Sequence, residues 1–199
     1  KQRDPEEYQE VIASNLEEIN YMSKVLEDLF ILSKSDENQI HLNCKRMDLR
    51  DLVEEVCKHA EVLAGDKDIP ITIAFLESVT INGDEVRLRQ MIWNILHNGI
   101  KYTQPGGELK VSLQDEGEFA LLSIQDTGIG IPEKDLPLIF DRFYRVDKAR
   151  SRDEGGSGLG LSICKHIAEA HKGKVEVESK PSVGTRFKIR TPSITRAAN

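Results

Sequence analysis

The sequence predicts an α/β sandwich, in which helices cover one face of a mixed β-sheet, preceded by one long α-helix. Two observations predict this class. Short segments of strand character occur mostly in pairs, and segments of helical periodicity lie between the pairs. In addition, residues 5–33 carry apolar side chains at spacings of three and four, a helical pattern longer than most globular proteins contain.

The long helix begins with clear local signals. Asp4 is a capping residue, Pro5 suits the first helical position, and acidic residues follow in the first turn. An apolar stripe then comprises Ile12, Leu16, Ile19, Met22, Leu26, Leu29 and Phe30. A single helix cannot bury such a stripe by itself, so we expect it to pack against a partner helix or a second chain. A polar run at 33–39 marks a boundary.

We therefore divide the chain into units at 1–36 and 37–191 and a tail at 192–199. Within the second unit the pattern alternates between strands and helices. The expected elements, in order, are a strand at 41–46, a helix capped by Asp48, strands at 69–76 and 79–82, a helix over 84–102, strands at 108–114 and 119–125, a short helix at 133–140, a helix over 159–171, and strands at 174–179 and 185–190.

Size, charge and cysteine content exclude several classes of protein. The 199 residues are 39% apolar, which is enough for one core and an appendage. The formal net charge is −7, so we expect no nucleic-acid partner. No apolar run reaches the length of a membrane span and no signal peptide is visible, so we expect a cytoplasmic fragment. The three cysteines lack metal-ligand or redox spacing and indicate ordinary thiols.

Two glycine clusters give the strongest indication of function. The first, Asp-Thr-Gly-Ile-Gly-Ile-Pro at 126–132, follows a predicted strand. The second, at 155–161, opens the helix over 159–171. Glycine lets a backbone approach a ligand without a Cβ in the way, and the N–H groups at a helix start attract anions. The two clusters therefore predict a nucleotide site with two separate walls.

The helix over 84–102 carries a third candidate part of this site. Asn94, Asn98 and Lys101 fall on one face of it. Amide oxygens are hard ligands that suit Mg²⁺, and a lysine one turn further along can neutralise phosphate charge. The alternative is that these three residues simply form the solvated side of an amphipathic helix.

Two further features fit a nucleotide. Asp126 is either a turn acid or a buried carboxylate that accepts a hydrogen bond from an exocyclic amine, which would select adenine over guanine. The segment 142–152 holds five bases and one acid. With Phe140 and Phe143 as hinge anchors, it would form a mobile lid whose Arg145 or neighbouring bases reach a terminal phosphate. The alternatives are a solvated loop and two core aromatics.

Four motifs together resemble sensor histidine kinases. Residues 94–103, Asn-Ile-Leu-His-Asn-Gly-Ile-Lys-Tyr-Thr, resemble the N box of that family, and residues 126–130 resemble its G1 box. Residues 140–145, Phe-Asp-Arg-Phe-Tyr-Arg, are similar to its F box, and residues 156–161 to its G2 box. The resemblance covers about residues 37–191, and the order of the four motifs makes it specific.

The resemblance implies the GHKL (Bergerat) fold and a Mg·ATP site. Asn98 would bind Mg²⁺ with Asn94 assisting, Lys101 and Tyr102 would contact phosphate or ribose, and Asp126 would contact the adenine amine. The lid would span roughly 141–157. The full set of ATP-binding residues that it implies is Asn94, Asn98, Lys101, Tyr102, Asp126, Gly128, Gly130, Ile131, Phe140, Arg145, Gly156, Ser157, Gly158, Leu159, Gly160 and Leu161. Gly99 departs from the family, which usually has alanine there.

The resemblance also implies a phosphoacceptor histidine that this sequence does not contain. In the family that histidine is followed by an acid and, a few residues on, a proline. None of the five histidines has this context, and we expect each on a solvated or half-buried surface: His41, His59, His97, His166 and His171. Residues 3–33 would be the second helix of a dimerisation and phosphotransfer hairpin whose first helix, with the acceptor, lies outside this chain.

The implied function is donation of the ATP γ-phosphoryl to that histidine, for onward transfer to an aspartate of a response regulator. The full-length parent would dimerise through the hairpin and would be membrane-anchored. Two alternatives stay open. One is an ATPase of the same fold, although such ATPases carry a catalytic glutamate where this chain has Asn94. The other is a non-catalytic nucleotide-binding signalling module.

Overall fold

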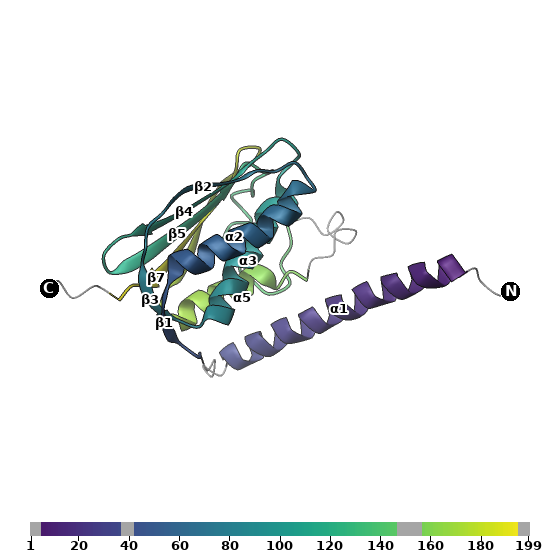
Figure 1. Ribbon diagram of the computed structural model, residues 1–199, viewed down its shortest axis with the longest axis horizontal. Coiled ribbons are helices and arrows are strands. Elements are labelled where there is room, and N and C mark those ends of the chain that lie inside the picture. Colours follow the sequence, from purple (N-terminus) through teal and green to yellow (C-terminus); the bar gives the residue numbers. More distant parts are fainter. Residues whose placement is uncertain (1–4, 37–41, 147–156, 195–199) are drawn as a thin grey trace. The chain divides into compact units, whose positions relative to one another are not determined.

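The computed structural model describes residues 5–36, 42–146 and 157–194, and the chain divides into two compact units, Lys1–Ile40 and His41–Asn199. The first unit contains one helix, α1 (Pro5–Asp36), of 32 residues (Figure 1). Its predicted apolar stripe is exposed: Ile12, Leu16, Ile19, Met22, Leu26, Leu29 and Phe30. The long helix that the sequence predicts is therefore confirmed, together with the apolar face that needs a partner.

The second unit is built on a five-stranded mixed sheet of order β2-β4-β5-β7-β6. β2 and β4 pair in parallel, and the other neighbours are antiparallel. The strands are β2 (Ile71–Leu76), β4 (Leu109–Asp115), β5 (Phe119–Asp126), β6 (Lys174–Lys180) and β7 (Gly184–Pro192). The predicted mixed sheet is confirmed.

Two of the predicted strands lie outside this sheet. β1 (Lys45–Asp48) pairs antiparallel with β3 (Thr80–Gly83) in a separate two-stranded sheet. β1 also begins later than the predicted 41–46, and the first residue of that prediction lies outside the described residues. An isolated bridge between Ile81 and Ser193 joins β3 to the chain after β7.

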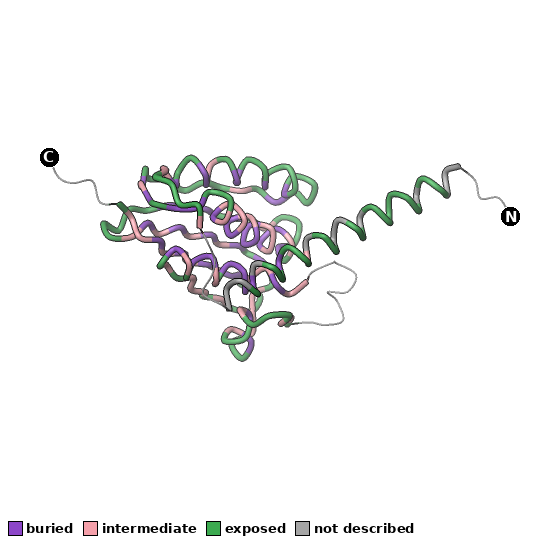
Figure 2. Tube along the Cα trace, turned by 90° about the horizontal axis from the view of Figure 1, so that it is seen from below, coloured by how far each residue is buried: buried purple, intermediate pink, exposed green. Residues whose placement is uncertain are grey.

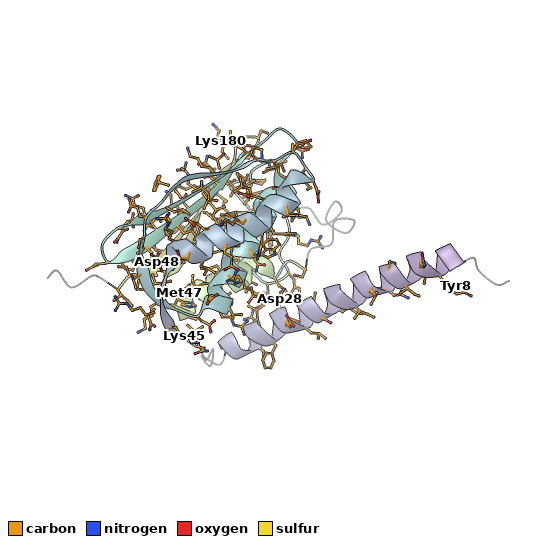
Figure 3. All side chains as sticks on the ribbon, viewed as in Figure 1. Tyr8, Asp28, Lys45, Met47, Asp48 and Lys180 are labelled. Carbon is orange, nitrogen blue, oxygen red and sulfur yellow. The ribbon has the colours of Figure 1, made fainter. Side chains whose placement is uncertain are left out.

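Helices α2 (Leu49–Gly65), α3 (Glu85–Tyr102) and α5 (Gly160–Ala170) lie together on one face of the large sheet (Figure 1). Aspartates begin the first two. Asp48, labelled at the start of α2 in Figure 3, accepts a hydrogen bond from the N–H of Arg50 at 2.9 Å. Asp84 caps α3 through the N–H of Arg87 at 3.1 Å. These caps pair N–H groups that a helix start otherwise leaves open.

The core lies between the helices and the sheet. Along β5, buried and half-buried residues alternate from Phe119 to Asp126, because successive side chains of a strand point to opposite faces. Figure 2 shows buried segments in both the helices and the strands of this unit. The buried residues of β5 are apolar except the last one, Asp126, which carries a carboxylate.

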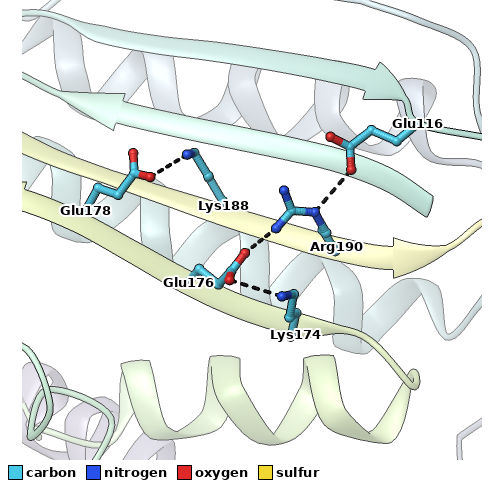
Figure 4. Close-up of polar contacts among 6 residues, drawn as sticks. All are labelled: Glu116, Lys174, Glu176, Glu178, Lys188 and Arg190. Atoms are coloured by element: carbon cyan, nitrogen blue, oxygen red, sulfur yellow. Dashed lines mark hydrogen bonds and ion pairs between the residues drawn. The ribbon is translucent and has the colours of Figure 1, made fainter.

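The open face of the sheet carries paired charges (Figure 4). Arg190 on β7 contacts both Glu116 and Glu176, and Lys174 contacts Glu176 at 3.0 Å. Exposed pairs of this kind contribute about 0–1 kcal/mol each. This face is therefore a balanced, solvated surface, and the residues of chemical interest lie on the helix side.

One predicted element does not form. Residues 133–140 make a series of turns and not the short helix that the sequence predicts. The carbonyl oxygen of Asp135 accepts from the N–H groups of Leu138 and Ile139, at 2.9 and 3.1 Å, but the next bond, from the N–H of Asp141 to the carbonyl of Leu138 at 2.8 Å, is again one of a turn. Pro137 explains the difference, because it has no N–H to donate and it disfavours the helical conformation of the residue before it.

Candidate functional site

The face of α3 that carries Asn94 and Asn98 meets the start of α5. Asn94 is buried, 9% exposed, and its Nδ2 donates to the carbonyl oxygen of Gly160 at 3.4 Å. A Cβ on Gly160 would lie 3.7 Å from the Asn94 amide, so these two residues are in contact. Asn98, one turn later, is half-buried, and its side-chain amide makes no hydrogen bond to any residue that the structure describes.

Gly99, the departure from the family pattern, faces the sheet from α3. A Cβ there would lie 2.9 Å from Cδ2 of Leu109 on β4 and 3.7 Å from Cβ of Asp126 on β5. The close approach of the helix uses the space that a methyl group would occupy.

Asp126 ends β5 as a buried carboxylate, 7% exposed. Its Oδ1 accepts two backbone hydrogen bonds, from Gly128 at 2.8 Å and from Thr185 at 3.1 Å. Within the described residues, no hydrogen bond reaches its Oδ2. Burial raises the pKa of the Asp126 carboxyl above its usual value, and the two hydrogen bonds oppose that rise. The carboxyl group is therefore fixed through one oxygen, and the other is available to a ligand.

The loop after Asp126 is held from two sides. The N–H of Ile129 donates to the carbonyl of Tyr102, at the end of α3, at 3.1 Å. On the other side, Gly130 has a φ of +69°, and a Cβ there would lie 2.1 Å from the carbonyl oxygen of Lys180. Lys180 ends β6 and is labelled in Figure 3. This glycine is required by both backbone conformation and space.

The start of α5 forms the second wall of the candidate site. The first N–H groups of α5, like those of any helix, have no partner within the helix. Leu159, fully buried, occupies the capping position and its side chain cannot supply one. Gly158 before it has a φ of +73°, and its carbonyl accepts from the N–H of Phe143 at 3.0 Å. Ser157 Oγ accepts from the N–H of Leu159 at 3.3 Å. The predicted helix start at this glycine cluster is confirmed.

The segment that resembles the F box contacts this wall through Phe143. Phe143 is 56% exposed and has a φ of +63°, an uncommon conformation for a side chain of this size. Next to it, the Tyr144 hydroxyl donates to Oδ1 of the buried Asp135 at 2.7 Å, and this hydrogen bond raises the pKa of Tyr144. Phe140 and Arg145 are half-buried.

Gly156 and most of the predicted lid, residues 147–156, lie outside the described residues. Of the other predicted residues, Lys101 and Tyr102 lie at the end of α3, where the Lys101 ammonium is 5.5 Å from the centre of the Tyr102 ring. Ile131 and Leu161 are both half-buried, at the end of the Asp126 loop and in the first turn of α5.

Two residues near Asp126 and its loop were not predicted from the sequence. Ser179 on β6 accepts from the N–H of Ile131 at 2.8 Å, and Thr185 on β7 supports Asp126 as described. Both lie at the ends of strands that the sequence predicts. Their position next to Asp126 depends on the order of the strands, because β7 pairs with β5 and β6 pairs with β7.

One expectation about the histidines is wrong. His171, expected on a solvated or half-buried surface, is buried, 7% exposed. Its Nε2 accepts from the N–H of Asp84 at 2.9 Å and its Nδ1 lies 2.8 Å from the carbonyl of Ile167. The neutral ring with its proton on Nδ1 satisfies both contacts. His171 therefore joins the end of α5 to the start of α3. His59 is exposed, and His97 and His166 are half-buried.

The cysteines show no sign of metal or redox chemistry among the described residues. Cys57 and Cys164 are buried, and Cys44 is exposed. Burial, with the nearby Glu61 and Glu54, raises the pKa of Cys57 to about 12, so its reactive thiolate form is suppressed. In the part of the chain that the structure describes, no group of three His, Cys, Asp or Glu residues could hold a metal ion.

Comparison with known proteins gives the class of this chain. A family model described as "Histidine kinase-, DNA gyrase B-, and HSP90-like ATPase" matches residues 83–195. Because the match covers more than half of the chain, the chain belongs to this family of ATPases.

The individual relatives narrow the class. The chain is 37% identical over 191 residues to the sensor histidine kinase CusS of Escherichia coli (strain K12), a match that covers 96% of this chain and 39% of CusS. It is 37% identical over 197 residues to the probable sensor kinase SilS of Salmonella typhimurium, covering 98% of this chain and 39% of SilS. The chain spans about two fifths of the length of these curated relatives.

Solved structures agree with this classification. The histidine kinase AdeS of Acinetobacter baumannii matches with a TM-score of 0.77 and 26% identity, over 96% of this chain and 86% of that chain. Full-length ShkA in complex with AMPPNP matches with a TM-score of 0.83 and 27% identity, over 100% of this chain and 41% of that chain. The second unit is thus the catalytic ATPase domain of a sensor histidine kinase, as its four motifs predict. None of the helices in the described part of the chain has the length and hydropathy needed to cross a membrane.

Proposed function

We propose that this chain binds Mg·ATP between α3, the Asp126 loop and the start of α5, and donates the γ-phosphoryl group to a histidine that lies outside this sequence. The observation that carries the proposal is the Asp126 carboxylate. It is buried and fixed through Oδ1 by two backbone N–H groups, and its Oδ2 is left to a ligand. Oδ2 is an acceptor with no hydrogen bond from a described residue, and the 6-amino group of adenine is a donor that fits it.

The residues on α3 and at the start of α5 fit a triphosphate and its metal ion. Asn98 would hold Mg²⁺ through its amide oxygen, with Asn94 assisting, because Mg²⁺ prefers oxygen ligands and takes most of the others from phosphate and water. The bound ion would neutralise the charge that develops on the transferred phosphoryl group.

The glycines at the start of α5 would bind the phosphates. The first N–H groups of α5 have no partner within the helix, and the positive end of the helix dipole lies there. Asn94 contacts Gly160 directly, so the amide that assists the metal is already beside this phosphate wall. Lys101, at the end of α3, would neutralise phosphate charge, and Arg145 would act from the lid. The remaining glycines, 128 and 130, would let the loop approach the base.

The acceptor and the partners belong to the whole protein. We propose that residues 1–36 are the second helix of a phosphotransfer hairpin, that 37–191 form the catalytic domain, and that 192–199 are a tail. The exposed stripe of α1 would pack in a homodimer of the full-length protein. The phosphoryl group would pass from the acceptor histidine to an aspartate of a response-regulator receiver domain. The catalytic domain would act in the cytoplasm, within a membrane-anchored parent.

A hydrolytic ATPase is the alternative within the same family. Such an enzyme needs a general base to activate water. The candidate position holds Asn94, whose amide cannot accept a proton and whose Nδ2 already donates to Gly160. We therefore favour phosphoryl donation over hydrolysis.

Two measurements on the same sample test the proposal. Calorimetry should show that the chain binds Mg·ATP with a dissociation constant that depends on Mg²⁺. Asn98→Ala should abolish that dependence, whereas His59→Ala, at an exposed position on α2, should leave it unchanged. A parallel phosphate-release assay should detect no steady hydrolysis. Absence of Mg·ATP binding by the wild type would overturn the nucleotide site, and steady hydrolysis would favour the ATPase alternative.

A further inference from the structure

One serine hydroxyl, at the end of β6, connects three separate parts of the candidate base site. Ser179 Oγ accepts from the N–H of Ile131 at 2.8 Å and donates to the carbonyl of Gly184 at 3.0 Å. It also lies 2.9 Å from Oγ1 of Thr185. Ile131 ends the Asp126 loop, and Gly184 and Thr185 begin β7. The serine therefore holds the loop against the strand that supports Asp126.

The number of hydrogens in this network gives the Thr185 hydroxyl a direction. A serine hydroxyl has one hydrogen to donate. The Gly184 carbonyl can only accept, and the Ile131 N–H can only donate, so the Ser179 hydrogen goes to Gly184. The hydrogen between the two hydroxyls must then come from Thr185. The remaining lone pairs of Thr185 Oγ1 are left to accept hydrogen bonds, and the hydroxyl has no hydrogen left to donate.

Thr185 lies beside Asp126. β5 and β7 pair with Gln125 opposite Arg186, so the next pair in the same antiparallel register is Asp126 and Thr185. The Thr185 N–H donates to Asp126 Oδ1 at 3.1 Å, and both residues are buried. In the alternation of each strand, both fall with the buried residues of the helix-covered side. The edge of the site therefore presents two adjacent acceptors, Asp126 Oδ2 and Thr185 Oγ1.

We propose that Ser179 is a positioning residue that makes this site select a 6-amino purine against a 6-oxo purine, by committing the Thr185 hydroxyl to the role of acceptor. This inference rests on the proposed nucleotide function. The 6-amino group of adenine has two hydrogens to donate to the two acceptors. The oxygen at the same position of hypoxanthine has only lone pairs, which would face lone pairs on both protein groups. Without Ser179, the Thr185 hydroxyl can rotate and donate to that oxygen.

The test compares Mg·ATP with Mg·ITP, whose base has an oxygen in place of the 6-amino group and a hydrogen on N1. In the wild type, calorimetry should give much tighter binding of ATP than of ITP. Ser179→Ala should lower the ratio of the two affinities about tenfold, because the Thr185 hydroxyl could then donate a neutral hydrogen bond to the 6-oxo group of ITP. Ser182→Ala changes an exposed hydroxyl in the turn that follows β6 and should leave the ratio unchanged. Ser179→Thr, which keeps a hydroxyl, should restore it.

A second variant separates selectivity from stability. Thr185→Val removes the hydroxyl itself, so it should also lower the ratio, and adding Ser179→Ala to it should lower the ratio no further. A purely structural serine would weaken ATP and ITP equally and leave the ratio unchanged, which would overturn the inference. If the wild type bound neither nucleotide, the proposed function itself would fail, so the two failures are distinguishable.

Discussion

Replacing Asp126 by asparagine should separate nucleotide binding from folding. The substitution keeps the shape of the side chain and removes its charge. Its oxygen should stay with the N–H groups of Gly128 and Thr185, which now hold Oδ1 of Asp126. The amide nitrogen must then occupy the place of Oδ2 and point a donor at the adenine amine, which is also a donor.

The magnitude follows from these contacts. The variant loses one charge-assisted hydrogen bond, about 1.5–3 kcal/mol, and leaves buried donors unpaired, about 1–3 kcal/mol. A total of about 2.5–6 kcal/mol corresponds to a dissociation constant roughly 60- to 20,000-fold higher. Calorimetry with Mg·ATP measures it directly, and Asp66→Asn, at an exposed aspartate after α2, is the matched control.

Although Asp126→Asn should weaken ATP binding, it should not lower the folding stability of the nucleotide-free protein. Burial raises the folded-state pKa of Asp126 above its ordinary value of 3.8, so the folded protein holds this proton more tightly than the unfolded chain does. The stability from this group is fully present below pH 3.8 and is lost as pH rises through the folded pKa. The asparagine variant should therefore be at least as stable as wild type at pH 7 in thermal melts.

If the Asp126→Asn variant bound ATP with a dissociation constant within threefold of the wild-type value, the role of Oδ2 would be refuted.

Three further predictions address the supporting structure. Gly130→Ala should lower the unfolding free energy by more than the roughly 1–2 kcal/mol of a left-handed alanine, because its Cβ would meet the Lys180 carbonyl at 2.1 Å. Gly117→Ala, also at positive φ but with open space, should show the backbone effect alone. Equal melting temperatures of the two variants would contradict this. His171→Ala should lower the unfolding free energy by about 1–3 kcal/mol in urea titrations, since the buried Asp84 N–H loses its acceptor; no loss relative to the wild type would contradict it. Asn98→Ala should abolish the Mg²⁺ dependence of ATP binding without lowering the melting temperature, as its amide makes no hydrogen bond to a described residue; a destabilised variant would assign Asn98 a structural role instead.

Local chemistry explains which elements could be predicted from the sequence. Asp48 and Asp84 cap the helices that begin after them, and the alternation along β5 places its buried side chains correctly. These signals depend on a few neighbouring residues. The helix predicted at 133–140 does not form, for an equally local reason: Pro137 interrupts a segment whose apolar spacing alone indicates a helix.

Features that depend on distant pairing could not be predicted in the same way. The separate sheet of β1 and β3 joins segments more than thirty residues apart. The burial of His171 follows from the packing of α5 against α3, since its acceptor nitrogen faces the N–H of Asp84, 87 residues away. Ser179 and Thr185 become neighbours of the Asp126 loop only through the strand order. No short motif in the sequence carries that information.

Phosphoryl transfer in trans tests the central claim most directly. The chain would be mixed with Mg²⁺, γ-labelled ATP and the phosphotransfer hairpin of its own full-length protein, supplied as a separate polypeptide that carries the acceptor histidine. We expect acid-labile label on the hairpin and none on this chain, and much less label on the hairpin with Asp126→Asn at an ATP concentration just sufficient to saturate the wild type. A hairpin that stays unlabelled while the chain binds Mg·ATP, or label that appears on this chain, would contradict it.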